Sequence, residues 1–389
     1  MLLSNSFLLF MNDKIIAFLT SAHPPLDDRI FYHQAKSLSG EYKTVIVAST
    51  EDLKTVADNV TIISKDCENW EKKKKIDFFV DVLNQTMPQI IVCSEPLPIL
   101  AAAKYRKNNK SKASILYDVT EWYPSKKNLG YLPFFSKIIS FIKLLVFNIY
   151  TSVFCNGFIF GEYYKSLPFR MLFPFKKWRI IGYSTNLEYI KYRESTLTPN
   201  KICLGYTGKI SVEKGIVNVF NVARSLKKKK PETEIRLKII GWFFDARDRA
   251  IFEKLCSESK DLNIEILGKQ KYESFSEQLA DIDVLFDLRK TDFENNHCLP
   301  IKIFYYAACG KPIIYSNLKA IKRDIDVAES GYLVNPTESD KIADYLVEYL
   351  EHPDLYKRHS LNGRRLAEEK YNWKLQQIDF IDFISKFQR

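Results

Sequence analysis

The residue pattern with the clearest chemistry lies in the second half of the chain, where residues 204–215 read LGYTGKISVEKG. Gly208 lets the backbone approach a ligand closely. Lys209 and Lys214 place two positive charges just before an expected helix, whose N-terminus itself favours anions. The pattern predicts a diphosphate site. It lacks the GxxxxGK[ST] spacing of a Walker loop, and read alone it also describes a tight turn with exposed lysines.

Two further segments add cations to this prediction. Gly268 and Lys269 follow one expected strand, and residues 299–312 (LPIKIFYYAACGKP) follow another. Pro300 favours the start of a helix, and the glycine near the end of the segment favours its termination. Lys302 then lies in the first turn of that helix, so we expect a second partial positive charge beside the first.

Near the start of the chain, residues 20–30 (TSAHPPLDDRI) follow an apolar run. His23 suits proton transfer or a phosphate contact because histidine titrates near neutral pH, although a loop histidine can equally cap backbone groups. Asp27 and Arg29 either pair to hold the loop or contact a ligand. No Gly-rich dinucleotide fingerprint is present here, which disfavours a Rossmann dehydrogenase.

Two carboxylates and two aromatic residues follow the apolar run 114–117, namely Asp118, Glu121, Trp122 and Tyr123. Aromatic rings stack on the apolar face of a pyranose while carboxylates accept its hydroxyl groups. The segment therefore indicates a sugar site, although an ordinary polar loop has the same composition.

These segments need a framework that gathers strand ends, and short apolar runs alternating with helical spacing predict one. The runs are 15–19, 44–48, 61–63, 90–93 and 114–117 in a first series, and 202–206, 235–240, 264–267, 284–286, 312–315 and 332–334 in a second. Each series indicates a doubly wound parallel sheet, whose ligands bind beyond the carboxyl ends of the strands. We expect an α/β protein of two Rossmann-like domains around a central cleft.

The composition agrees with a folded protein that has an anionic partner. The 389 residues are 46% hydrophobic, and 58 Lys and Arg against 47 Asp and Glu give a net charge of +11. Seven cysteines without a CxxC pair favour buried thiols in a reducing compartment and disfavour a zinc site. The opening MLLSNSFLLF lacks a basic region and a cleavage site, so a secretory signal is not favoured, and Met1 and Met11 both remain candidate starts.

Much of the positive charge lies between Ser125 and Thr185. Nine basic residues face one acid there: Lys126, Lys127, Lys137, Lys143, Lys165, Arg170, Lys176, Lys177 and Arg179 against Glu162. Interleaved aromatic residues favour a peripheral contact with an anionic membrane. Nucleic acid is disfavoured because no nucleic-acid module is present, and a solvated helix face is the alternative. Residues 144–161 are interpreted as a helix running into a strand rather than as a membrane span.

Five segments in order resemble the retaining glycosyltransferase family 4, whose members have the two-domain GT-B fold. They are AHPPLDDRIFYHQAKSL (22–38), GYTGKISVEKGI (205–216), LPIKIFYYAACGKPIIYSN (299–317), ESGYLVNP (329–336) and NGRRLAEEKYNW (362–373). The resemblance spans the whole chain. It implies an acceptor-binding domain (1–185), a connector (186–200), a nucleotide-sugar-binding domain (201–372) and a C-terminal helix (373–389) that packs toward the first domain.

The resemblance also implies roles for residues. Lys209 and Lys214 would hold the donor diphosphate beside Gly208, Gly268 and Lys269 would lie near the base, and Lys302 would face the phosphates and ribose. No metal or other cofactor would be required. His23, Asp118 and Glu121 would hold the acceptor or manage its proton. The triplet Asp281-Ile282-Asp283 resembles a metal motif but precedes a strand and is interpreted as structural.

Two positions depart from the family pattern. A glutamate that accepts ribose hydroxyls in relatives is replaced by Tyr305, with His297 eight residues earlier, and Thr120 stands where many relatives carry histidine. We therefore expect a cytoplasmic glycosyltransferase of cell-surface polysaccharide or lipopolysaccharide synthesis, positioned at the inner face of the plasma membrane, with a carbohydrate or lipid-linked acceptor. A nucleotide-sugar epimerase and a non-catalytic partner protein of the same fold are the alternatives.

Overall fold

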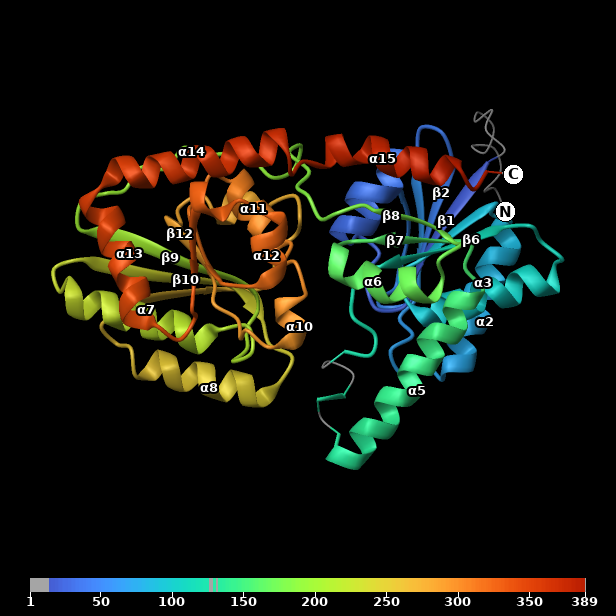
Figure 1. The fold of residues 1–389 in the computed structure, drawn as a ribbon, viewed down its shortest axis with the longest axis horizontal. Helices are drawn as coiled ribbons and strands as arrows, with labels where there is room; N and C mark the ends of the chain where they lie inside the picture. The colour runs from blue at the N-terminus through green and yellow to red at the C-terminus, as the bar shows by residue number, and fades with distance from the viewer. Residues whose placement is uncertain (1–13, 126–128, 131, 389) are drawn as a thin grey trace, which may run out of the picture. The chain divides into compact units, whose positions relative to one another are not determined.

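A computed structural model describes residues 14–125, 129–130 and 132–388. Four residues discussed above lie outside these ranges: Met1, Met11, Lys126 and Lys127. The described chain forms two compact units (Figure 1). The first unit contains the residues up to Gly182 and those from Lys374 onward, and the second contains Tyr183–Trp373.

The described part of the first unit is built on an eight-stranded sheet in the order β3-β4-β2-β1-β5-β6-β7-β8. Its strands are β1 (Ile15–Thr20), β2 (Lys43–Ala48), β3 (Leu53–Ala57), β4 (Val60–Ser64), β5 (Ile90–Cys93), β6 (Ser114–Val119), β7 (Gly157–Phe160) and β8 (Lys177–Ile180). Neighbouring strands are parallel except for β3, which runs antiparallel to β4. The central strands are buried almost throughout, which explains why their sequences are nearly continuous apolar runs.

Helical segments connect and cover this sheet. They are the π-helix η1 (Asp28–Ala35), α1 (Lys36–Leu38), α2 (Lys72–Thr86), α3 (Pro96–Asn108), α5 (Phe134–Val153), α6 (Tyr163–Leu172) and α15 (Trp373–Ser385). The segment after α15 belongs to the packing of this unit, because the Ser114 hydroxyl donates to the Phe387 carbonyl at 3.1 Å. A Cβ atom on Gly157 would lie 2.5 Å from the Phe387 ring, so the glycine makes room for that ring.

The second unit has a six-stranded parallel sheet in its described residues, in the order β11-β10-β9-β12-β13-β14. The strands are β9 (Lys201–Lys209), β10 (Glu234–Trp242), β11 (Asn263–Leu267), β12 (Val284–Asp287), β13 (Ile313–Ser316) and β14 (Gly331–Val334). The helical segments are α7 (Ile216–Lys229), α8 (Ala246–Ser257), α9 (Phe275–Gln278), α10 (Phe293–Asn296), α11 (Lys302–Ala308), α12 (Lys319–Asp324), η2 (Val327–Glu329), α13 (Ser339–Glu351) and α14 (Pro353–Glu369). Strands β9 and β12 are adjacent at the centre, so their carboxyl ends meet.

The apolar runs predicted as strands are strands in the structure, and residues 144–161 are a helix followed by a strand, as expected. The sequence analysis missed β3 and β8, which lie at the two edges of the first sheet. Most of their residues are exposed, so neither strand carries the apolar run on which the prediction depends. Five of the seven cysteines are buried and all are free thiols.

Candidate functional site

In the second unit, two cations contact one buried carboxylate where β9 and β12 end, and a third cation lies close to them. The fully buried Asp287, the last residue of β12, accepts hydrogen bonds from Arg289 Nε at 2.6 Å and Nη2 at 2.5 Å. Lys302 Nζ lies 3.0 Å from the same carboxylate and donates to the Thr207 carbonyl at 2.7 Å. We call Asp287, Arg289, Lys302 and Lys214 the basic cluster.

The charges in the basic cluster do not balance. Burial alone would raise the pKa of Asp287, but the charges of Arg289 and Lys302 outweigh it and hold that pKa well below its usual range. Burial lowers the pKa of Lys302, and the nearby charges of Arg289 and Lys214 act in the same direction. Glu213 Oε1 lies 3.5 Å from Lys214 Nζ, so the three cations face two carboxylates and positive charge remains in excess, which favours an anion.

Gly215 explains how Lys214 reaches this cluster. Gly215 has φ +88°, and a Cβ atom there would lie 2.0 Å from the Leu288 carbonyl oxygen. The loop before α7 therefore packs directly against the chain that leaves β12. Lys290 N donates to the Glu213 carbonyl at 3.1 Å and fixes the same approach. Lys214 Nζ donates to Asn295 Oδ1 at 3.2 Å, while its charge acts on Lys302.

Gly208 lies beside Lys302, as an anion site near the backbone requires. Its φ is +95°, and the aliphatic carbons and Nζ of Lys302 lie within 4 Å of the position that a Cβ would take. Strand β10 approaches just as closely, because a Cβ on Gly241 would be 2.0 Å from the Gly208 oxygen. A side chain at either glycine would strain this corner of the sheet.

The remaining predicted donor residues lie elsewhere in the second unit. Lys209 Nζ lies 5.4 Å from the ring centroid of Phe244, and Lys269 Nζ lies 5.6 Å from that of Trp242. Gly268 has open space where a Cβ would be. Lys214 and Lys302 therefore come together, whereas Lys209 and Lys269 contact aromatic residues at the end of β10.

Tyr305, at the position of the family glutamate, is a buried residue of α11. Its ring packs edge-on against Tyr272 and Phe275, with centroid distances of 5.7 and 6.0 Å. This packing shows how an aromatic ring is accommodated at the position where the family resemblance predicts a carboxylate. His297, eight residues earlier, follows α10, and its ring contacts Phe293.

In the first unit, His23 lies between carboxylates at the carboxyl ends of the strands. Its Nδ1 is 3.4 Å from Asp27 Oδ2, and its Nε2 is 3.5 Å from Glu95 Oε1. Glu95 also accepts hydrogen bonds from Thr20 Oγ1 and from the backbone N–H of Ser21, both at 2.8 Å. Glu95 follows β5, just as Thr20 ends β1.

This site has the opposite charge from the basic cluster. Burial alone would lower the pKa of His23, but hydrogen bonding and charge from Asp27, with the charges of Glu95 and Glu121, raise it to about 10. Burial raises the pKa of Glu95. We call His23, Asp27, Glu95 and Glu121 the acidic cluster. With His23 protonated and the carboxylates ionised, negative charge remains in excess.

The sequence predicted that Asp118 follows a strand, but the structure places it within one. It is a buried residue within β6, and its carboxylate accepts bonds from Arg29 Nε and Nη2, both at 2.8 Å, and from Gln34 Nε2 at 2.7 Å. Arg29 also donates to the Ile181 carbonyl at 3.1 Å. Asp118 is therefore held in a buried ion pair, and its catalytic role stays a prediction.

The alternative in which Asp27 and Arg29 hold the loop and start the helix is confirmed in part. Asp27 caps η1 by accepting the backbone N–H groups of Arg29 and Ile30, while the Arg29 guanidinium bonds to Asp118. Thr120 follows β6, and its carbonyl accepts a hydrogen bond from the buried Lys165. Three members of the two clusters were absent from the prediction: Glu95, Asp287 and Arg289. Each lies at or within two residues of a strand end, the place where ligand contacts were expected, so this rule could have found them.

The Asp281-Ile282-Asp283 triplet has structural contacts, as interpreted. Asp281 accepts hydrogen bonds from Arg236 and Lys238, and Asp283 accepts the backbone N–H of Cys203 at 2.7 Å. Across the residues that the structure describes, no group of three or more His, Cys, Asp or Glu side chains is placed to hold a metal ion.

Comparison with a protein family concerns the second unit. Residues 189–366 match the family model described as glycosyl transferases group 1. The matched range includes the whole basic cluster. No curated protein sequence matches the chain.

Solved structures match nearly the whole chain. Sucrose-phosphate synthase from Thermosynechococcus elongatus is 14% identical with a TM-score of 0.75, and the match covers 96% of this chain and 98% of that one. HepE from Anabaena in complex with UDP-glucose is 13% identical with a TM-score of 0.69, covering 96% and 99%. A structure described as trehalose-6-phosphate from E. coli bound with UDP-2-fluoro glucose is 13% identical with a TM-score of 0.69, covering 95% and 98%.

These similarities, together with the parallel sheets of the two units, show which fold the chain has. The chain has the GT-B glycosyltransferase fold, and the expected fold class is confirmed.

Proposed function

We propose that this protein is a glycosyltransferase that moves a sugar from a nucleoside diphosphate sugar to a carbohydrate or lipid-linked acceptor, with retention at the anomeric carbon. The observation that carries the proposal is the basic cluster, with its excess of positive charge, inside the residues that match glycosyl transferases group 1. Two similar structures contain UDP-glucose and UDP-2-fluoro glucose, which supports a nucleotide-sugar donor.

The basic cluster is suited to a departing diphosphate. Lys302 is fixed between Asp287 and the Thr207 carbonyl, and Lys214 is fixed by Asn295, so their charges are in place before the sugar leaves. Preorganised cations of this kind stabilise the negative charge that develops on the leaving oxygen. They supply the charge that a divalent metal supplies in other transferases, so the reaction should proceed without one.

The acidic cluster is suited to an acceptor rich in hydroxyl groups. Because its neighbours raise the pKa of His23 to about 10, the imidazole is protonated near neutral pH and donates hydrogen bonds. Glu95 and Glu121 supply acceptors for sugar hydroxyls. His23 and Glu121 thus keep the acceptor-binding role expected from the sequence, and Glu95 joins them.

The departure at Tyr305 changes how the donor ribose is recognised. Its phenol cannot offer the two charged acceptors of a glutamate. Lys209 and Lys269, which lie against Phe244 and Trp242, are the remaining candidates near the nucleoside. We place the reaction in cell-surface polysaccharide synthesis on the cytoplasmic side of the membrane.

The test is calorimetric titration of the full chain with UDP, GDP and ADP, first without metal and then with magnesium. We expect one diphosphate to bind without metal, and Lys214→Ala to weaken that binding and lower turnover by about tenfold or more, because it removes a fixed charged contact. Lys229→Ala is the matched control, since Lys229 pairs with Asp344 at the surface.

Each alternative has its own signature in this experiment. Failure of all three diphosphates to bind would favour a non-catalytic partner protein. Binding followed by conversion of the nucleotide sugar in acceptor-free buffer would favour an epimerase. Equal affinities of the wild type and Lys214→Ala would remove the diphosphate assignment.

A further inference from the structure

Helix α5 (Phe134–Val153) is inverted relative to an ordinary surface helix. A surface helix normally turns its apolar stripe toward the core. In α5 the buried residues are Asn148, Thr151 and Ser152, all polar. The exposed large apolar residues are Phe134, Phe135, Ile138, Ile139, Phe141, Ile142, Leu145, Val146, Tyr150 and Val153. Phe134 and Phe135 are 71% and 78% exposed, so these rings lack the cover that a core residue has.

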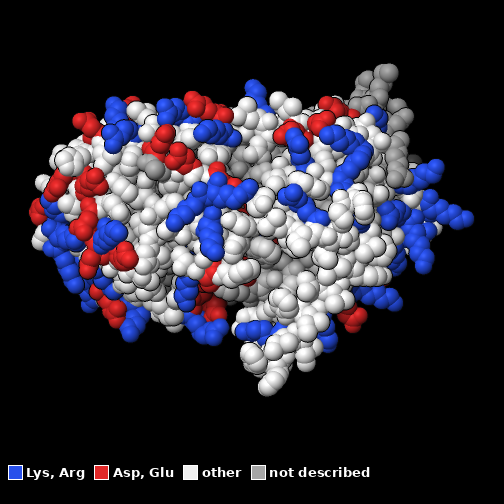
Figure 2. Space-filling model, viewed as in Figure 1, with Lys and Arg blue, Asp and Glu red and all other residues white. Residues whose placement is uncertain are grey.

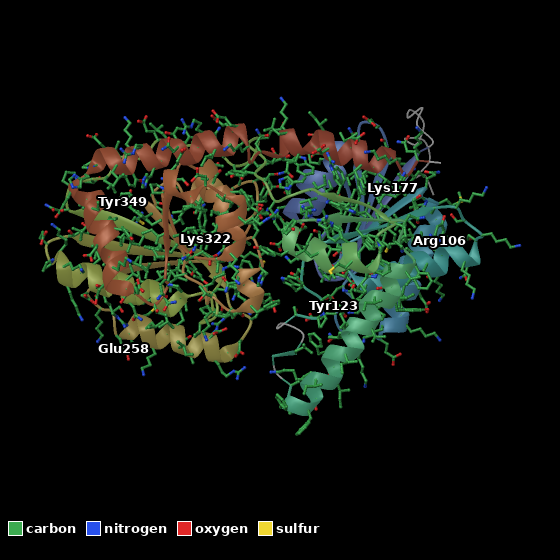
Figure 3. The ribbon with its side chains drawn as sticks, in the orientation of Figure 1. Arg106, Tyr123, Lys177, Glu258, Lys322 and Tyr349 are labelled. Carbon is green, nitrogen blue, oxygen red and sulfur yellow. The ribbon has the colours of Figure 1, made fainter. Side chains whose placement is uncertain are left out.

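The exposed apolar residues form one continuous face. At about 100° per residue they fall within roughly half of the helix circumference. Lys137 and Lys143 lie on the two borders of that half, one on each side. Figure 2 shows α5 as a mostly uncharged projection, and Figure 3 shows its side chains extending away from the rest of the first unit. Apolar face and flanking cations together are the pattern of a helix that lies in a membrane interface.

A second exposed apolar segment adjoins the C-terminal end of α5. Lys176 Nζ donates to the carbonyl groups of Ser152, Val153 and Cys155, each at 2.8 Å, so residues 171–178 are held at this end. In that segment the exposed apolar residues are Met171, Leu172, Phe175 and Trp178. Arg170 and Lys177 are cations there, whereas Arg179 is paired with Asp379, and the sequence from Trp122 to Gly161 contains no Asp or Glu. The surface is thus both apolar and basic.

The anchoring of α5 decides how deeply it can enter a bilayer. Among the described residues, α5 alone is long and apolar enough to cross a membrane by length and composition. Its last turns are fixed in the protein, however, because Asn148 Nδ2 donates to the Tyr123 carbonyl at 3.0 Å and Thr151 and Ser152 are buried. Residues 134–147 span roughly 21 Å as a helix, less than the ~30 Å hydrocarbon core. The helix therefore enters one leaflet and does not span.

We propose that α5, with residues 171–178, inserts into one leaflet of a bilayer that contains anionic lipids. The apolar half of the helix enters the acyl region, while Lys137, Lys143 and Lys177 contact headgroup phosphates. A second copy of the chain is the competing occupant. The bordering cations favour the lipid, because two copies would bring these like charges toward each other without an acid on the face to pair with them. The inserted surface does not include the basic cluster, so the inference stands apart from the donor assignment.

The experiment is flotation of the full chain with vesicles of phosphatidylcholine alone and of phosphatidylcholine with phosphatidylglycerol. We expect binding to the anionic vesicles, weaker binding to the neutral ones, and weakening as salt is raised. The double variant Ile139→Glu/Ile142→Glu should bind anionic vesicles about tenfold less or worse, because it places two charges in the acyl region. Ile378→Glu is the matched control, since Ile378 is an exposed residue of α15, and it should bind as the wild type does.

Several outcomes would overturn the proposal. These are absence of wild-type binding to anionic vesicles, unchanged binding of the double variant, and a lipid-free dimer that the double variant dissociates while vesicle binding persists. The thermal midpoint and UDP titration of each variant report whether the fold and donor site remain intact. If the double variant does not fold, Phe135→Ser, at the most exposed of the large apolar residues of α5, replaces it and should lower anionic-vesicle binding, and unchanged binding would again contradict insertion.

Discussion

The acidic and basic clusters occupy equivalent positions on two similar sheets but have opposite charge. In the first unit one imidazolium faces three carboxylates, and in the second three cations face Asp287 and Glu213, so the first cluster keeps negative charge and the second keeps positive charge. Both lie where parallel strands end, the general binding position of such sheets. The fold therefore fixes where a ligand binds, and the few residues after each strand fix the charge of that ligand. A hydroxyl-rich acceptor suits the first cluster and a diphosphate the second.

Each unit also buries a carboxylate beside an arginine, and the two pairs differ in balance. Asp118 meets Arg29 and the neutral Gln34, so the group has no net charge. Asp287 meets both Arg289 and Lys302, so the group keeps a positive charge. The first arrangement is a closed structural pair, whereas the second remains attractive to an anion.

The largest expected effect follows from Asp287→Asn. The substitution leaves Arg289 and Lys302 buried without their carboxylate, and breaking a buried ion pair on one side costs about 3–5 kcal/mol of unfolding free energy. Urea unfolding of the variant and the wild type measures this loss. Asp344→Asn is the surface control, because its pair with Lys229 is exposed, and it should cost less than about 1 kcal/mol.

Asp118→Asn tests whether the neutral pair of Asp118 and Arg29 differs from the positively charged group around Asp287. It should destabilise the chain by a similar amount, because Arg29 also loses its partner. Added inorganic pyrophosphate should restore part of the stability of Asp287→Asn, since an anion replaces the missing charge, and none of that of Asp118→Asn. Equal recovery of both variants, or of neither, would show that the basic cluster is not an anion site.

The fold was predictable from the sequence wherever burial on both faces of a strand requires a run of apolar residues. Strands covered on both faces, such as β1 and β9, appear as uninterrupted apolar runs, whereas the edge strands β3 and β8 do not. A helix here and exposed aromatic residues were also expected, but the buried polar residues of α5 were not. Periodicity reports that a helix has an apolar side, and tertiary contacts such as that of Asn148 with Tyr123 decide which side turns inward.

The candidate sites were predictable only in part. Lys214 and Lys302 were found because glycine and proline mark the loops that carry them. The burial of Asp118 was not expected, because its partner Arg29 is 89 residues away in sequence and no local pattern pairs them. Asp287 was passed over for the same reason, since its role depends on Arg289 and Lys302 together. The donor and acceptor roles of the residues remain predictions.

The acidic cluster predicts a pH dependence of intermediate size. The pKa of His23 is raised to about 10 from 6.5, so its contribution to stability is complete below about pH 6.5 and is lost as the pH rises through about 10. A single proton gives a slope of at most roughly 1.4 kcal/mol per pH unit in the unfolding free energy. Glu95→Gln should lower the folded-state pKa of His23 by removing one of the charges that raise it, so the loss of stability should end at a lower pH than in the wild type. Urea unfolding between pH 6 and 10 measures this range, and an unchanged range would contradict the coupling.

The smallest expected effect tests how far the basic cluster extends. Lys269 is exposed and lies over Trp242, so Lys269→Ala should change the unfolding free energy by less than about 0.5 kcal/mol. Its effect on UDP affinity should be a few-fold at most, as for an exposed cation near an aromatic ring, and clearly less than that of Lys214→Ala. Comparison of the two variants by calorimetry locates the boundary of the site. Equal losses of UDP affinity would place the anion site nearer the end of β10 than the end of β12. The positive charge that distinguishes the second unit from the first would then come from cations that do not contact Asp287.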